Sequence, residues 1–300
     1  MSTSVWPSAL DDELVRLALR SRIGWPPNPL DDDPNKQLVD ALYQQMIEEL
    51  HVEPGEMAVA FYPKVESTNT MLLRWIQRYA DDMQPTLLIT KEQTAAHGRM
   101  GRPWVAEADG ALTFSLALPL APKDWSGLSL AIGLALAETL HPDIRIKWPN
   151  DLQIDGRKLA GILIEIASGW AVIGVGINLR APAPGSATAA ALAAHGVQAA
   201  WLEELLPGIT APAALLRCAV PLIHAVRAFE QHGFAPLQAR FATRDALAGR
   251  DIELSDGNAG AACGVAPDGA LRVRTAQGIT LIRSGAVSVR PAASTPAHPC

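Results

Sequence analysis

The longest apolar stretch of the chain, residues 161–179, is long enough to raise the question of a membrane span. It contains Glu165, however, and it is interrupted by Ser168-Gly169, a pair typical of a tight turn. Two strands joined by a hairpin, at 159–167 and 170–179, explain this stretch better than a membrane span does. The whole chain is 49% hydrophobic and 19% charged, which excludes a disordered, collagen-like or coiled-coil protein.

Strand-like and helix-like segments alternate from residue 57 onwards. Besides the hairpin, the pattern predicts strands at 57–65, 86–92, 111–119 and 144–148, and helices at 70–79, 126–140 and 212–232. Residues 181–200, rich in alanine, proline and glycine, are predicted to be a connector. Five short strands then follow at 251–254, 260–265, 271–275, 279–283 and 287–290. This organisation predicts an α+β fold with a mixed sheet and a small C-terminal β-barrel.

Residues 1–55 differ from the rest of the chain. They contain two segments, 25–29 and 31–34, that cannot continue a helix or a central strand, and one predicted amphipathic helix at about 34–51 with few basic residues. This pattern favours an extension packed on the main domain over a DNA-reading role. The first ten residues lack the features of a signal peptide, and the net charge is −6. We therefore expect a cytoplasmic protein that binds neither DNA nor membranes.

Two polar clusters precede the middle of the chain. The string STN at 67–69 stands directly before a predicted helix, where it needs no role beyond that of an N-cap. A helix N-terminus of this kind also suits a polar or anionic ligand. The second cluster, residues 93–104, contains two glycines and two arginines within five residues. Such a loop is either an ordinary solvated loop or a flexible cationic loop that surrounds a carboxylate or phosphate.

Two more clusters lie in and around the predicted strands. The string KWPND at 147–151 places an amide and a carboxylate directly after a strand, where they suit a nucleotide and Mg²⁺. The string RKLAGILIE at 157–165 places Lys158 at the mouth of a buried strand, and GVGIN at 174–178 closes the hairpin. Each of these features has an ordinary structural explanation when it is taken alone. Their occurrence together, in this order, has no such ordinary explanation.

Together these strings resemble the catalytic domain of biotin–protein ligases. The resemblance runs from about residue 65 to the C-terminus, and the last strands resemble the small SH3-like barrel that ends these enzymes, best at 264–269 and 285–290. It implies a biotin/lipoate-ligase-type catalytic domain at 56–245 and an SH3-like barrel at 246–292. Residues 1–55 would be an extension of unknown role, and residues 293–300 a tail.

The resemblance implies a two-step reaction. The carboxylate of biotin attacks the α-phosphorus of ATP, which carries Mg²⁺, and gives biotinyl-5′-AMP and pyrophosphate. A specific lysine on the biotin carboxyl carrier domain of acetyl-CoA carboxylase or a related carboxylase then attacks the anhydride and releases AMP. Because a carboxylate must approach a polyphosphate, catalysis should depend on positioning and on cancellation of charge.

The resemblance also implies roles for individual residues. Lys158, Arg99 and Asp151 would act in catalysis, with Lys158 hydrogen-bonded to the reacting carboxylate. Asp151 would either bind Mg²⁺ or accept a proton from the carrier lysine, and Trp104 would support the loop. Biotin would be bound by Ser67, Thr68, Asn69, Gln93, His97, Gly98, Arg99 and Lys158, and ATP by Arg102, Lys147, Trp148, Asn150 and Asn178.

Two departures and three alternatives accompany this interpretation. His97 stands where the family most often has arginine, and residues 1–60 offer no counterpart to the winged helix of those members that are biotin repressors. The alternatives are a ligase for another acyl cofactor such as lipoate, a biotin-responsive DNA-binding regulator, and a catalytically silent module that binds the carrier. The complete STN and KWPND strings favour biotin over lipoate, and Lys158 and Arg99 favour an active enzyme.

Overall fold

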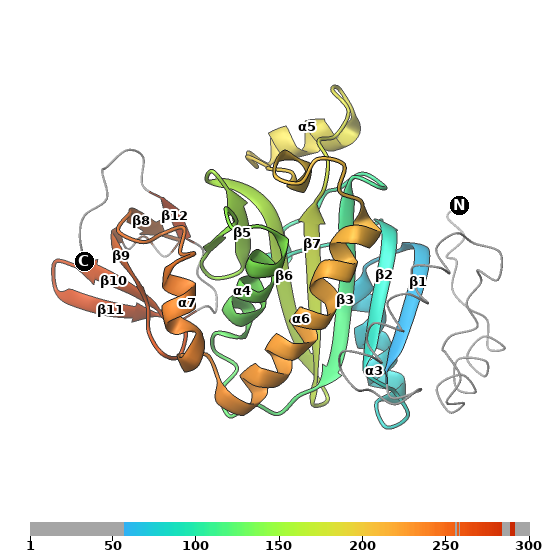
Figure 1. The fold of residues 1–300 in the computed structure, drawn as a ribbon, viewed down its shortest axis with the longest axis horizontal. Helices are drawn as coiled ribbons and strands as arrows, with labels where there is room; N and C mark the ends of the chain where they lie inside the picture. Colours follow the sequence, from blue (N-terminus) through green and yellow to red (C-terminus); the bar gives the residue numbers. More distant parts are fainter. Residues whose placement is uncertain (1–56, 256, 258, 284–288, 292–300) are drawn as a thin grey trace. The chain divides into compact units, whose positions relative to one another are not determined.

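The computed structural model describes residues 57–255, 257, 259–283 and 289–291. The predicted extension at 1–55, its helix at 34–51 and the tail at 293–300 lie outside the described residues. Two sheets are present (Figure 1): a mixed sheet of seven strands in the order β1-β2-β3-β7-β6-β5-β4 and a sheet of five strands in the order β11-β10-β9-β8-β12. The α+β class that the sequence predicted is confirmed.

Six of the seven strands coincide closely with the predicted ones. They are β1 (Ala58–Val65), β2 (Thr86–Gln93), β3 (Ala111–Pro119), β4 (Arg145–Lys147), β5 (Asp151–Ile154), β6 (Arg157–Ala167) and β7 (Trp170–Asn178). β1 and β2 are parallel, and β2–β3, β4–β5 and β5–β6 are antiparallel. The sequence did not predict β5. Its signal was the Asp155-Gly156 turn, where both residues have positive φ, because such a turn joins two strands.

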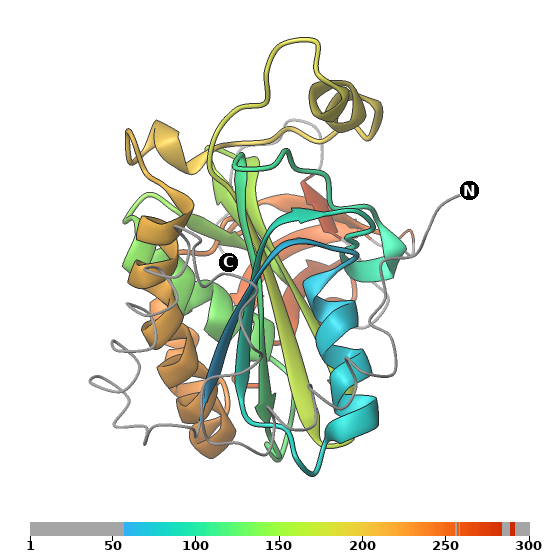
Figure 2. The same cartoon turned by 90° about the vertical axis from the view of Figure 1, so that its right-hand side faces the viewer.

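The chain forms two compact units, and the first holds the described residues up to Ala96 with Thr113–Leu120 and Ile164–Gly174. Its helix α3 (Thr68–Tyr79) begins after Ser67, whose hydroxyl accepts a hydrogen bond from the Thr70 N–H at 3.4 Å. α3 lies along one face of the strands (Figure 2), and Leu72 and Ile76 on one side of the helix pack into a core with residues of the strands. This spacing of apolar residues is what directs the helix onto the sheet.

The second unit holds His97–Leu112, Ala121–Leu163 and the residues from Val175 onwards. Its helix α4 (Leu128–Leu140) is buried nearly all round, as the sequence predicted, and it packs against α6 (Ala211–His232). Within the described part of the chain, only α6 is long and apolar enough to cross a membrane by length and composition. Half of its apolar window is buried, which is typical of a core helix, so α6 is weak evidence for a span.

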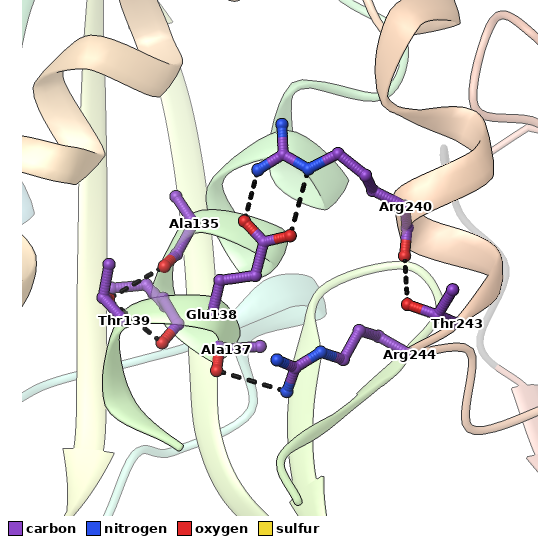
Figure 3. A network of polar contacts seen from close by, with 8 residues as sticks. Ala135, Ala137, Glu138, Thr139, Arg240, Thr243 and Arg244 are labelled. Carbon is purple, nitrogen blue, oxygen red and sulfur yellow. Dashed lines mark hydrogen bonds and ion pairs between the residues drawn. The ribbon is translucent and has the colours of Figure 1, made fainter. Parts of the chain in front are cut away.

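Side chains of α7 and of the residues that follow it fasten α4. A short helix, α7 (Gln238–Ala242), carries Arg240, whose guanidinium pairs with Glu138 on α4 (Figure 3). Arg244 Nη1 lies 2.8–3.4 Å from four backbone carbonyl oxygens at and beyond the end of α4, among which its two protons are shared. A cation beside the C-terminal end of a helix also interacts favourably with the helix dipole.

The predicted connector contains a helix that the sequence did not reveal. α5 (Ala187–Ala194) begins after Ser186, whose hydroxyl accepts from the Ala189 N–H at 3.2 Å. None of its residues is buried, so it has no apolar stripe and no periodic signal, only the high helix propensity of alanine.

The five-stranded sheet agrees with the predicted C-terminal strands. It consists of β8 (Asp251–Leu254), β9 (Ala259–Val265), β10 (Leu271–Thr275), β11 (Gly278–Ile282) and β12 (Val289–Pro291). The pairings β8–β9, β9–β10, β10–β11 and β8–β12 are antiparallel. A small antiparallel sheet of this kind is consistent with the SH3-like module that the resemblance implied.

Candidate functional site

A buried polar cluster surrounds the start of α3 in the first unit. Thr68 and Asn69 are 4% and 3% exposed, and Ser115 of β3 is fully buried. Ser115 Oγ lies 2.6 Å from both Thr68 Oγ1 and Asn69 Oδ1. Gln93, at the end of β2, accepts a hydrogen bond from the Thr68 N–H at 2.8 Å. Of the predicted biotin residues, Ser67, Thr68, Asn69 and Gln93 therefore gather here.

Glu165 completes this cluster. The amide nitrogen of Asn69 donates to a carboxylate oxygen of Glu165 at 2.8 Å. Gly174 makes room for the amide, because a Cβ at that position would lie 2.4 Å from Asn69 Oδ1. The glycine of the GVGIN string is thus required by the close approach of a side chain.

The cationic loop lies in the second unit and forms a compact turn. His97 pairs with Pro103 in an isolated β-bridge, and the Gly98 N–H donates to the Arg102 carbonyl at 2.7 Å. Met100 and Gly101 both have positive φ, 59° and 68°, and the Met100 side chain is 59% exposed. The left-handed conformation at two successive residues explains why glycine is found here.

The loop brings Arg99 to the KWPND string. Arg99 Nη1 donates to Asn150 Oδ1 at 3.3 Å, and the Asn150 amide nitrogen donates to the Ile162 carbonyl at 2.8 Å. Burial lowers the pKa of Arg99, Asp151 raises it and Arg102 lowers it again. The guanidinium is therefore partly desolvated beside one carboxylate and one further cation, which is a suitable environment for binding an anion.

Asp151 and Lys158 form an ion pair across the β5–β6 hairpin. Asp151 Oδ1 lies 2.7 Å from Lys158 Nζ, and the two side chains are 22% and 31% exposed. A bulge at Leu159 of β6 shifts the register, so that Asp151 stands opposite Gly161 and Lys158 stands opposite Gln153. A Cβ at Gly161 would lie 3.4 Å from Lys158 Nζ, so position 161 lies directly beside the ammonium.

Trp104 lies against the same ammonium. Lys158 Nζ is 5.8 Å from the centroid of the Trp104 ring, a cation–π distance. A Cβ at Gly176 would lie 2.5 Å from the ring, so this second glycine of GVGIN allows the indole to lie on β7. Trp104 Nε1 is buried without a hydrogen-bond partner in the part of the chain that the structure describes.

The remaining predicted nucleotide residues occupy different surroundings. The Asn178 amide donates to the Lys158 carbonyl at 3.1 Å, and Lys147 stands opposite Asp151 in the β4–β5 pairing. Trp148 is 1% exposed, and its indole N–H donates to the Gly269 carbonyl at 3.0 Å. Trp148 thereby fastens β4 to the C-terminal module, and its predicted contact with the nucleotide stays a prediction.

Sequence reasoning missed Ser115 and Glu165 as members of the polar cluster. Ser115 is one of two hydroxyl-bearing residues, with Thr113, in an otherwise apolar strand, and Glu165 is a single carboxylate inside an apolar hairpin. A polar residue in a buried strand needs a hydrogen-bond partner, and this was the available signal.

The sequence is similar to proteins of a known family. A model described as "Biotin/lipoate A/B protein ligase family" matches residues 61–180. The "bifunctional ligase/repressor BirA" of Salmonella typhimurium is 31% identical over 274 residues, which cover 85% of this chain and 80% of that protein. The chain belongs to the biotin/lipoate A/B protein ligase family. A second member, the "biotin--[acetyl-CoA-carboxylase] ligase" of Paracoccus denitrificans, is 34% identical over 67% of this chain and 88% of its own length.

Solved structures of the family agree with the fold. The biotin protein ligase from Aquifex aeolicus in complex with biotin and ATP has a TM-score of 0.66 and 25% identity, and the match covers 78% of this chain and 99% of that one. These comparisons confirm the sequence prediction of an enzyme of the biotin–protein ligase type.

Proposed function

We propose that this protein activates biotin as biotinyl-5′-AMP and transfers it to a lysine of a biotin carboxyl carrier domain. The observation that carries the proposal is the cluster of Arg99, Asn150, Asp151 and Lys158 in the second unit, where an ammonium and a guanidinium are held by fixed partners. Its family members include proteins named as biotin ligases of acetyl-CoA carboxylase. Biotin is therefore a better candidate substrate than lipoate.

In the first step, a biotin carboxylate oxygen bonds to the α-phosphorus of Mg·ATP, and the bond to pyrophosphate breaks. Lys158 and Arg99 cancel negative charge as two anions approach each other, and preorganised donors of this kind need no reorientation during the reaction. The Asp151 carboxylate and the Trp104 ring hold the Lys158 ammonium in place. In the second step, the carrier lysine amine attacks the anhydride carbonyl, loses a proton and releases AMP.

Asp151 fits both roles that the sequence left open. One carboxylate together with the phosphates of the nucleotide is the usual protein contribution to binding of Mg·ATP, and a carboxylate is also a possible proton acceptor. Across the described ranges, His, Cys, Asp and Glu side chains do not gather in groups of three or more. We expect Mg²⁺ to arrive with ATP as part of the substrate, since Mg²⁺ is usually bound by one or two carboxylates together with the phosphates of a nucleotide.

The neutral cluster of the first unit would hold the biotin ureido ring. Thr68, Asn69 and Gln93 offer hydroxyl and amide groups that are already fixed by hydrogen bonds, and such groups lose little freedom when a ligand binds. We expect the enzyme to act in the cytoplasm on the carrier domain of acetyl-CoA carboxylase or a related carboxylase.

The test is incubation of the protein with Mg·ATP, biotin and a biotin carboxyl carrier domain, followed by mass spectrometry of the carrier. The expected result is an increase in mass by one biotinyl group at one lysine, and release of pyrophosphate. The matched reaction contains lipoate in place of biotin. A carrier that gains no mass with biotin contradicts the proposal, and modification of a lipoyl domain by lipoate alone would favour the alternative ligase.

A further inference from the structure

A continuous chain of four polar side chains runs through the first unit. It begins at Glu165 on β6, passes through Asn69 and Ser115, and ends at Thr68 on α3. The successive heavy-atom distances are 2.8, 2.6 and 2.6 Å. Three of the four residues are almost completely buried, so each hydrogen bond is made in surroundings where a missing partner is costly.

Counting the protons fixes the direction of this chain. The Glu165 carboxylate accepts and does not donate, so Asn69 directs its NH₂ group to Glu165 and its oxygen to Ser115. An amide oxygen cannot donate, and therefore the one hydroxyl proton of Ser115 goes to Asn69. The proton in the remaining 2.6 Å contact must then come from Thr68.

The second contact of Thr68 is compatible with this order. Thr68 Oγ1 also lies 3.2 Å from Gln93 Oε1, which accepts the Thr68 backbone N–H at 2.8 Å. The shorter contact, with Ser115, takes the single hydroxyl proton. Thr68 Oγ1 is then left with lone pairs only, and it can meet a ligand only as an acceptor.

We propose that Glu165 is a specificity-determining positioning residue, which makes the Thr68 hydroxyl an obligate acceptor for a ligand N–H. The proposal rests on the proposed function, since the ligand N–H is that of a cyclic urea such as biotin. A ring that carries an acceptor at the same position, such as a cyclic carbamate, places an oxygen against an oxygen and is rejected. A site built for one hydrogen bond rejects the analogue that lacks it, because the buried polar group is then unpaired.

The test compares binding of biotin with binding of two cyclic carbamate analogues, in which a ring oxygen replaces one or the other urea N–H. Isothermal titration calorimetry without ATP measures affinity independently of catalysis. The wild-type protein should prefer biotin to at least one analogue by about 100-fold or more. Glu165→Gln should reduce this ratio about tenfold or more, because a carboxamide can present either a donor or an acceptor to Asn69.

Two further variants test whether the effect comes from the hydrogen-bonded chain or from the loss of a carboxylate in general. Ser115→Ala interrupts the chain without changing charge, and it should also reduce the ratio, since the Thr68 proton is then free to turn toward the ligand. Glu92→Gln removes a carboxylate that pairs with Lys64 at 2.5 Å on an exposed part of β1 and β2, and it should leave the ratio unchanged. Thermal melting of each variant checks that it is folded.

The outcomes separate the two proposals. A wild-type protein that binds no biotin contradicts the proposed function itself. If biotin binds, and Glu165→Gln and Ser115→Ala lower the affinities for biotin and carbamate equally, then Glu165 is merely structural and the inference is wrong. A reduced ratio in both variants, with Glu92→Gln unchanged, supports it.

Discussion

The two polar clusters differ in how they are made ready for a ligand. The cluster of the first unit has an almost completely buried centre at Thr68, Asn69 and Ser115, consists mainly of neutral groups and is joined by hydrogen bonds of 2.6–2.8 Å between residues far apart in the sequence. The cluster of the second unit is partly exposed and charged, and a short hairpin and a loop bring its members together. Buried neutral groups select a ligand by the direction of their hydrogen bonds, whereas partly solvated cations bind whatever anion approaches. The first cluster is therefore suited to specificity and the second to catalysis.

The most severe test of this division is Lys158→Ala. Loss of one preorganised charged donor should lower adenylate formation by about 10²–10³. Biotin binding in the absence of ATP should change much less, because the neutral cluster is intact. Pyrophosphate release and calorimetric titration measure the two effects.

The matched control for this variant is Lys64→Ala, since Lys64 is exposed and pairs with Glu92 at a distance along the sheet from the Lys158 ion pair's strands, β5 and β6. Its activity should equal that of the wild-type protein. A folded Lys158→Ala protein that releases pyrophosphate at the wild-type rate would remove Lys158 from the reaction.

The two glycines of GVGIN allow the clusters to be disturbed one at a time. Gly174→Ala places a Cβ 2.4 Å from Asn69 Oδ1, and Gly176→Ala places one 2.5 Å from the Trp104 ring. Each should lower the free energy of unfolding by about 1–3 kcal/mol through overpacking. Gly174→Ala should weaken biotin binding, whereas Gly176→Ala should slow adenylation at saturating biotin.

Denaturant unfolding, calorimetry and pyrophosphate release measure these effects. Gly133→Ala is the control, because its Cβ would meet side chains only at 3.5–3.6 Å. If Gly174→Ala and Gly176→Ala had the same effect on binding and on adenylation, the separation of roles between the clusters would be lost.

The difference between the clusters also explains what the sequence could predict. Asp151 and Lys158 lie on adjoining strands of one hairpin, and the Asp155-Gly156 turn between them is visible in the sequence, so their proximity follows from local rules. The partners of Asn69 lie 46 and 96 residues away in the chain, at Ser115 and Glu165. Only the register and order of the sheet bring them together, and these depend on packing that local patterns do not specify.

Bulges, buried contacts and weak local signals account for the other differences. The bulge in β6 that sets Asp151 opposite Gly161 has no local signature in the sequence. Trp148 was predicted beside the nucleotide because it stands in KWPND, but the position of Gly269, which accepts its N–H, depends on tertiary packing. α5 was missed because an alanine-rich helix that buries none of its residues lacks an apolar stripe.

Asp245 is a second carboxylate of the second unit and differs from Asp151 in its surroundings. Asp151 pairs with Lys158, whereas no ion pair of Asp245 is found among the described residues. Burial raises its pKa from 3.8 to about 6, and its Oδ2 has no hydrogen-bond partner among the described residues. The neighbouring Arg244 directs its guanidinium to backbone carbonyls instead. Since the folded-state pKa is raised, the contribution of Asp245 to stability is fully present below pH 4 and is lost as the pH rises through 6.

Asp245→Asn should therefore raise the free energy of unfolding at pH 7 by about 1–2 kcal/mol, with little change at pH 4. Chemical denaturation at both pH values measures this. Asp143→Asn, at an exposed position beside His141, is the control and should show a smaller difference between the two pH values. A destabilised Asp245→Asn protein at pH 7 would mean that the carboxylate has a partner that offsets its burial.

The smallest expected effect concerns the cationic loop, where His97 occupies a position that is most often arginine in the family. The backbone of this residue is held in the bridge to Pro103, so a longer side chain can be introduced without breaking the turn. His97→Arg adds a permanent guanidinium next to Arg99, and the loop would then hold an anion more tightly. We expect biotinyl-AMP to dissociate severalfold more slowly from the variant at low salt. The advantage should shrink as salt is added, because a partly exposed charge is screened.

His97→Gln is the matched control, since it retains a polar side chain without a permanent charge and should not slow dissociation. Equal dissociation rates for the wild-type protein and His97→Arg at low salt would show that Arg99 and the loop backbone hold the anion alone. The charged cluster would then already be saturated with positive charge, and further cations would add nothing to it.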